Sequence, residues 1–120
     1  MRPPIFSTIS AVSAVTDLLG TDPVRFFPFG QAPDEVELPY AVWQTVSGSP
    51  ENYLSGGPSV DSWLVQVDVY AKRGSTARNV AEALRDAIEP EAYITAWRGE
   101  RKEDDNIIRY SFDADFLVER

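Results

Sequence analysis

Two segments in which apolar and polar residues strictly alternate place the strongest constraint on the fold of this chain. The first is Trp63–Tyr70 and the second is Ile107–Val118. Successive side chains of a β-strand point to opposite faces, so each segment predicts a strand with one apolar face. The other face of the second strand carries Arg109, Asp113 and Asp115. This pattern is typical of an antiparallel sheet with one face packed on a core and the other in water.

Two further segments have the periodicity of helices. In Pro4–Leu19 the apolar residues recur at helical spacing, and Gly20 fits the position that ends a helix. A second helix is predicted between Ser75, a residue type favoured at N-caps, and Pro90, which stops it. Its apolar face consists of Ala77, Val80, Ala81, Leu84, Ala87 and Ile88. Both helices are amphipathic and each has one face to bury.

Three shorter segments complete the predicted sheet, because they are rich in β-branched or aromatic residues. They are Val24–Phe27, Tyr40–Val46 and Ala92–Arg98. Prolines, glycines and acidic residues predict a loop over Pro28–Pro39, and turn-forming residues predict another over Ser47–Asp61. The polar run Gly99–Asn106 has the composition of a hairpin tip.

The order of these elements predicts an α+β fold. The chain has 120 residues, enough for one domain with its own core, so residues 1–120 are expected to form a single domain. In the order α-β-β-β-α-β-β, adjacent strands are joined by hairpins. The sheet is therefore expected to be mainly antiparallel, with two helices packed on one face.

Composition excludes most catalytic and metal chemistry. The chain contains no histidine and no cysteine, so catalytic triads, zinc fingers, haem ligation and redox cysteine pairs are excluded. Its net charge of −8 argues against binding to DNA phosphates. The N-terminus lacks the continuous apolar region of a signal peptide and there is no membrane-spanning stretch, so we expect a soluble, intracellular chain without a membrane partner.

The remaining chemical candidates favour ordinary surface structure. Asp113 and Asp115 share a strand face and are the basis of one alternative, a carboxylate-metal hydrolase that also uses the acids at 100–105. We interpret them instead as a solvated strand face. Lys72–Ser75 precedes a helix and is interpreted as a cap rather than an anion site. No catalytic, cofactor-binding or metal residue is predicted, no cofactor is expected, and the protein is not expected to be an enzyme.

Apolar residues in predicted loops or at their borders form the candidate interface. These residues are Phe27, Phe29, Tyr53 and Leu54. Tyr53 and Leu54 lie in a long, Gly-rich segment without periodic apolar partners, which is the pattern of an anchor that another chain buries. The alternative is that the loops fold back and bury these side chains within the same domain.

Segments along nearly the whole chain resemble one protein family. They are Pro4–Gly20, Val24–Pro33, Leu38–Gln44, Gly48–Leu54, Val65–Ala71 and Arg109–Asp113. Together they look like the tail terminator, or tail completion, proteins of long-tailed bacteriophages and prophages. The resemblance consists of many loosely specific positions rather than a catalytic signature.

The resemblance implies a structural function. Such proteins form a hexameric ring on the head-proximal end of the phage tail tube, stop its polymerisation and present a surface to the head connector. The implied partners are further copies of the chain, monomeric when dilute, the tail tube protein and the connector protein. The implied location is the virion tail, after assembly in the host cytoplasm. The alternative is a small non-viral α+β module that binds a ligand or protein.

An acidic ring suits a channel through which DNA slides without binding, because the wall repels phosphates. The acids expected to line this bore are Asp34, Glu35, Glu37, Glu103, Asp104 and Asp105.

Overall fold

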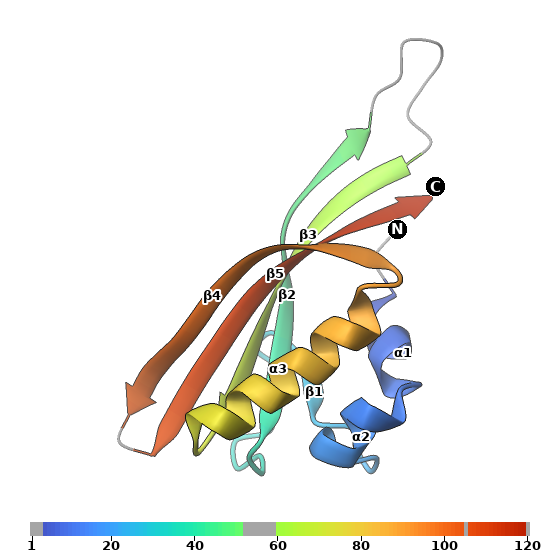
Figure 1. Ribbon diagram of the computed structural model, residues 1–120. Coiled ribbons are helices and arrows are strands. Elements are labelled where there is room, and N and C mark those ends of the chain that lie inside the picture. Colours follow the sequence, from blue (N-terminus) through green and yellow to red (C-terminus); the bar gives the residue numbers. More distant parts are fainter. Residues whose placement is uncertain (1–3, 52–59, 105, 120) are drawn as a thin grey trace.

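The two alternating segments lie side by side at the centre of a sheet in the computed structural model, which describes residues 4–51, 60–104 and 106–119 (Figure 1). The strands of this part of the chain are β1 (Phe26–Pro28), β2 (Tyr40–Glu51), β3 (Val60–Ala71), β4 (Ala92–Asp104) and β5 (Ile107–Glu119). Their order across the sheet is β1-β2-β3-β5-β4. All pairs are antiparallel except β1 with β2, which is parallel. The predicted α+β class with a mainly antiparallel sheet is confirmed.

The helices lie together on one face of the sheet, as predicted (Figure 1). They are α1 (Ile5–Ser10), α2 (Ser13–Leu19) and α3 (Gly74–Ile88). The buried residues of α3 are the six that its periodicity predicts. The N-cap of α3 is Arg73, and no side chain caps the helix, so the prediction that Ser75 is the N-cap is wrong. Among the described residues, no helix is long and apolar enough to cross a membrane.

The predicted helix over Pro4–Leu19 is two helices. The chain breaks at Val12, whose backbone is extended. Thr8 Oγ1 donates to the Pro4 carbonyl at 2.7 Å, and hydroxyls that bond the preceding turn in this way compete with the regular helix. The break keeps the apolar spacing in phase, because Ile9 before it and Val15 after it are both buried. Periodicity alone therefore gives no sign of it.

The hairpin of β2 and β3 is longer than predicted. Residues 47–51 and 60–61, predicted as loop, form strand pairs that end at Glu51 and Val60. Gly48 fits because the Trp63 ring lies over it: a Cβ at Gly48 would come within 2.6 Å of that ring. Pro50 is tolerated because β2 is an outer strand here and its missing N–H is not needed. In Figure 1 this hairpin extends beyond the helices.

The second hairpin and the first strand also differ from prediction. Most of the predicted tip Gly99–Asn106 is strand, since β4 continues to Asp104. Gly99 has φ +76, a left-handed conformation that favours glycine, beside an irregularity in the pairing of β4 with β5. The short strand β1 begins two residues later than predicted. Arg25 holds it in place, because its Nε donates to the Pro39 carbonyl at 2.9 Å.

The core lies between the helices and the apolar face of the sheet. Its largest fully buried aromatic side chains are Phe26, Phe112 and Phe116. Trp97 of β4 covers the edge of this layer, with its ring centroid 5.1 Å from that of Phe112. The helices of the described residues leave the opposite face of the sheet uncovered (Figure 1), and this face carries polar side chains of the alternating strands such as Asp68 and Ser111.

Candidate assembly surfaces

A hydrogen-bonded polar network covers the centre of the helix-free face. Ser111 Oγ donates to Asp68 Oδ1 at 2.6 Å, and Gln66 Nε2 donates to the same oxygen at 3.0 Å. Asp68 and Ser111 are each only 5% exposed. Buried polar groups that are paired in this way stiffen a sheet rather than offer reactive groups. The centre of this face is therefore structural.

Asp113 is buried, so its interpretation as a solvated side chain is wrong. Arg98 on β4 donates to it from two nitrogens, at 3.2 and 2.7 Å. The Asp113 side chain is 7% exposed, whereas that of Arg98 is 55% exposed and shields it from water. The hydrogen bond to Asp113 raises the pKa of Arg98 further above its ordinary value. The ion pair between Arg98 and Asp113 therefore links β4 to β5.

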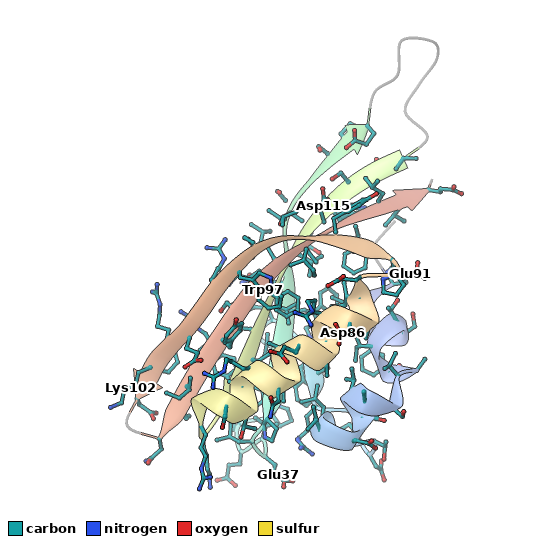
Figure 2. All side chains as sticks on the ribbon, viewed as in Figure 1. Glu37, Asp86, Glu91, Trp97, Lys102 and Asp115 are labelled. Carbon is teal, nitrogen blue, oxygen red and sulfur yellow. The ribbon has the colours of Figure 1, made fainter. Side chains whose placement is uncertain are left out.

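The acids of the hydrolase alternative do not come together. Asp115 accepts a hydrogen bond from Ser62 at 2.6 Å, and Glu100 pairs with Arg78 of α3. Figure 2 places Asp115 and Lys102, at the far end of β4, in separate regions of the sheet. Among the described residues no group of three or more acidic side chains is arranged to hold a metal ion. The geometry gives this alternative no support.

Two stacked tyrosines mark the end of the sheet where β2 begins. The rings of Tyr40 and Tyr70 lie 5.0 Å apart between centroids. Burial raises the pKa of Tyr70 above its ordinary value, and the Asp68 carboxylate raises it further. Burial also raises the pKa of Tyr40. In both cases the folded state favours the neutral phenol.

Stability is therefore expected to fall as the pH rises above about 10, since the unfolded chain loses its phenolic protons first. A Tyr70→Phe variant removes one of these groups, so its free energy of unfolding should decline less steeply in this range. Urea denaturation at a series of alkaline pH values measures the slope. Tyr93→Phe, at a position 68% exposed, controls for the loss of a phenol hydroxyl. A Tyr70→Phe slope equal to that of the wild type would contradict the expectation.

The predicted interface residues lie in different surroundings. Phe27 is half-buried in β1, whereas Phe29, just after β1, is 66% exposed. The Phe29 N–H donates to the Trp43 carbonyl at 2.8 Å, which fixes the backbone beside β2. Tyr53 and Leu54 lie outside the described residues. Phe29 is thus an apolar side chain held outward by ordered backbone, as a binding residue requires.

An aromatic groove of about 400 Å³ opens beside Phe29. Its lining residues are Pro28, Phe29, Trp43, Gln44, Thr45 and Trp63. The indole Nε1 atoms of Trp43 and Trp63 are buried, and neither has a hydrogen-bond acceptor among the described residues. Sequence reasoning missed this groove, because both tryptophans fit the core face of their strands and nothing local shows that their N–H groups lack acceptors.

The predicted bore acids that are described all lie on the surface. Asp34, Glu35 and Glu37 are exposed in the segment before β2, and Glu103 and Asp104 are exposed at the end of β4. Figure 2 shows Glu37 and Lys102 toward the same end of the molecule.

Arginines lie close to both groups of acids: Arg25 is 3.9 Å from Glu37, and Arg109 is 2.8 Å from Glu103. Asp105 lies outside the described residues. The negative charge of this end is therefore partly balanced.

The sheet has two open edges of different character. Beyond Pro28, no described residue pairs with the outer side of β2 from Gln44 to Glu51. On the other side of the sheet, β4 pairs only with β5 within the described chain. Exposed edges of this kind accept strands or segments of other chains.

Comparison with known proteins identifies the family. The family model of the tail completion protein gp17 matches residues 3–119. The chain belongs to this family. No curated protein matches it in sequence. Tail completion proteins are structural, so the prediction that the protein is not an enzyme is confirmed. The prediction that it is a component of the tail of a phage-like particle is also confirmed. The alternative of a small non-viral binding module is wrong.

Two solved structures share the fold of this tail completion protein. A chain in the virion of a native gene transfer agent particle has a TM-score of 0.72 and 15% identity, with 97% of this chain and 92% of that chain covered. Gp17 of bacteriophage SPP1 has a TM-score of 0.58 and 9% identity, with 97% and 86% covered. At such low identity these likenesses speak for the fold alone.

Proposed function

We propose that this tail completion protein forms a ring on the head-proximal end of the tail tube, ends its polymerisation and provides the docking surface for the head connector. One observation carries the proposal: as far as the described residues show, the subunit has two different open sheet edges on opposite sides, β2 beyond Pro28 and β4. A closed ring with head-to-tail contacts needs two different patches on each subunit. The proposed ring is hexameric, as the family resemblance implies.

The two edges differ chemically, which favours contact between unlike patches. The open part of β2 carries a single charged residue, Glu51. The end of β4 is charged throughout, from Glu100 to Asp104. Two β2 edges or two β4 edges facing each other would give a closed dimer instead of a ring. Association should depend on concentration, because each contact is made by a modest patch.

Electron microscopy of the purified protein mixed with tail tubes tests the proposal. We expect a ring at one end of each tube, and light scattering over a dilution series should show larger species only at high concentration. Particles produced without the protein should have overlong tails that are not joined to heads. A fixed dimer at every concentration, with bare tube ends, would overturn the proposal.

A charge-reversal experiment tests the proposed bore. If Asp34, Glu35 and Glu37 line it, changing all three to lysine should slow the passage of DNA, most strongly at low salt, where the attraction is least screened. The fold should be retained, because exposed substitutions each change stability by less than about 0.5 kcal/mol. The rate of DNA ejection from particles, measured at two salt concentrations, tests this expectation.

The matched control reverses the same number of acids on the exposed face of α3 and at its C-cap. These are Glu82, Asp86 and Glu89. DNA passage should be normal in this variant. If ejection is slowed by the α3 changes and not by those before β2, the helices face the channel and the proposed lining is wrong.

A further inference from the structure

The aromatic groove beside Phe29 has the properties of a binding site for a segment of another chain. We infer that it receives the tip of the β2–β3 hairpin, residues 52–59, from the neighbouring copy in the ring. The inference rests on the proposed ring and specifies which parts of adjacent subunits meet. Four properties of the groove and of the hairpin carry it.

The first property is the pair of unsatisfied donors. Trp43 Nε1 and Trp63 Nε1 are removed from water, and no described residue accepts from either. Most buried N–H groups in proteins are paired, and an unpaired one lowers stability. Backbone carbonyls of a bound peptide would satisfy both indoles if the rings turn as the groove is filled, because each Nε1 is covered in the free subunit. The groove is therefore suited to a peptide rather than to a purely apolar group.

The second property is the open strand edge along the groove. Gln44 and Thr45 line it, and they begin the part of β2 whose outer side has no described partner. A peptide lying along this edge would continue the sheet where β1 stops at Pro28, while its side chains lie against the tryptophans. Extended peptides commonly bind at such edges through backbone hydrogen bonds.

The third property is charge. None of the described residues that line the groove is charged, although the protein has a net charge of −8. Residues 52–59 read Asn-Tyr-Leu-Ser-Gly-Gly-Pro-Ser and are also uncharged. The other hairpin has acidic residues, Glu103 and Asp104, at the end of β4 and would place carboxylates against an apolar wall. The β2–β3 tip matches the groove in charge, and Tyr53 and Leu54 supply the apolar side chains.

The fourth property is reach, which favours an occupant from another copy. Trp43 precedes Glu51 by eight positions on the same strand, a distance of about 26 Å at the rise of a strand. The eight residues 52–59 start and end at the paired residues Glu51 and Val60, so they extend at most about 14 Å from them. The tip therefore falls short of Trp43 and Phe29 in its own subunit. A contact from the tip of one copy to the groove of the next joins two different patches and repeats around a ring.

Engineered cysteines test the contact without interference, because the chain contains none of its own. The test variant combines Thr45→Cys in the groove with Ser55→Cys in the tip, which keeps Phe29, Tyr53 and Leu54. The matched control combines Ser55→Cys with Tyr93→Cys, since Tyr93 is exposed like Thr45 but lies on β4, at the opposite side of the sheet. Both proteins are oxidised at a concentration at which rings are seen by electron microscopy and analysed on denaturing gels.

We expect a ladder of cross-linked species up to the full ring from the test variant, and little beyond the background of random collisions from the control. A mixture of the two single variants, Thr45→Cys and Ser55→Cys, should give disulfide-linked dimers that contain one chain of each. If rings form but the two double variants cross-link to the same extent, the inference is wrong and the ring stands. If the wild-type protein forms no ring with tail tubes, the proposed function fails.

Discussion

Replacement of Phe112 by alanine is expected to lower the free energy of unfolding by about 3–5 kcal/mol. Phe112 lies at the centre of β5, is fully buried, and contacts the Trp97 ring. Alanine would remove most of these contacts and leave a cavity that β3 and α3 cannot close without moving. Since small domains are stable by only about 5–15 kcal/mol, this single change is expected to leave a marginal fold. Urea denaturation monitored by circular dichroism measures the loss.

The same substitution at Phe29 is the control. Phe29 is 66% exposed, so Phe29→Ala should change the free energy of unfolding by less than about 0.5 kcal/mol. Its effect should appear in assembly instead, because it lines the aromatic groove. Equal destabilisation by the two alanines would show that Phe29 belongs to the core of the free subunit and would remove it from the interface.

The parts of the fold that follow from local pattern could be predicted from the sequence. In β3 and β5, residues two positions apart lie on the same face of the sheet. In α3, residues three or four positions apart lie on the same face of the helix. The buried residues Val65, Val67 and Phe112, and the six of α3, all lie on the predicted faces. The role in tail assembly was inferred from the resemblance to the tail completion family, because no local sequence pattern indicates it.

The features that depend on distant partners could not be predicted. Gly48 and Pro50 favour a loop by themselves, and they are in a strand only because β3 pairs with them. Aspartate is a residue type that is usually exposed. Asp113 is buried because an irregular register of β4 with β5 brings Arg98 over it. Such contacts join positions that are 10 or more residues apart in the chain, where side-chain periodicity carries no information.

The aromatic groove has the same origin. Trp43 and Trp63 belong to different strands, where they pair with Val67 and Gly48, and both line the groove. Each is compatible with a core position when taken alone. What separates them from core tryptophans is the missing acceptor for each indole N–H, and this becomes visible only when the surroundings of both rings are known.

A double change of Tyr53→Asp and Leu54→Asp is expected to abolish ring formation while leaving the subunit folded. If these residues are interface anchors, their loss removes little burial within the monomer, so the melting temperature should stay within a few degrees of the wild type. Two carboxylates in each contact would then be desolvated against a neighbour, which is unfavourable without a partner charge. Particles made with this variant should have overlong tails and unjoined heads, seen by electron microscopy.

The matched control is Tyr93→Asp with Leu117→Asp, which makes the same changes at positions 68% and 48% exposed on β4 and β5. It alters charge and exposed apolar area to a similar degree but lies away from the hairpin and the groove, so it should still form rings. A loss of several kcal/mol in the Tyr53, Leu54 variant would mean that the two residues fold back onto their own sheet, because charges placed in an apolar site unfold a domain of this size. A stable variant that produces tails of normal length joined to heads would exclude the hairpin tip from assembly, and the contact between the tip and the groove with it.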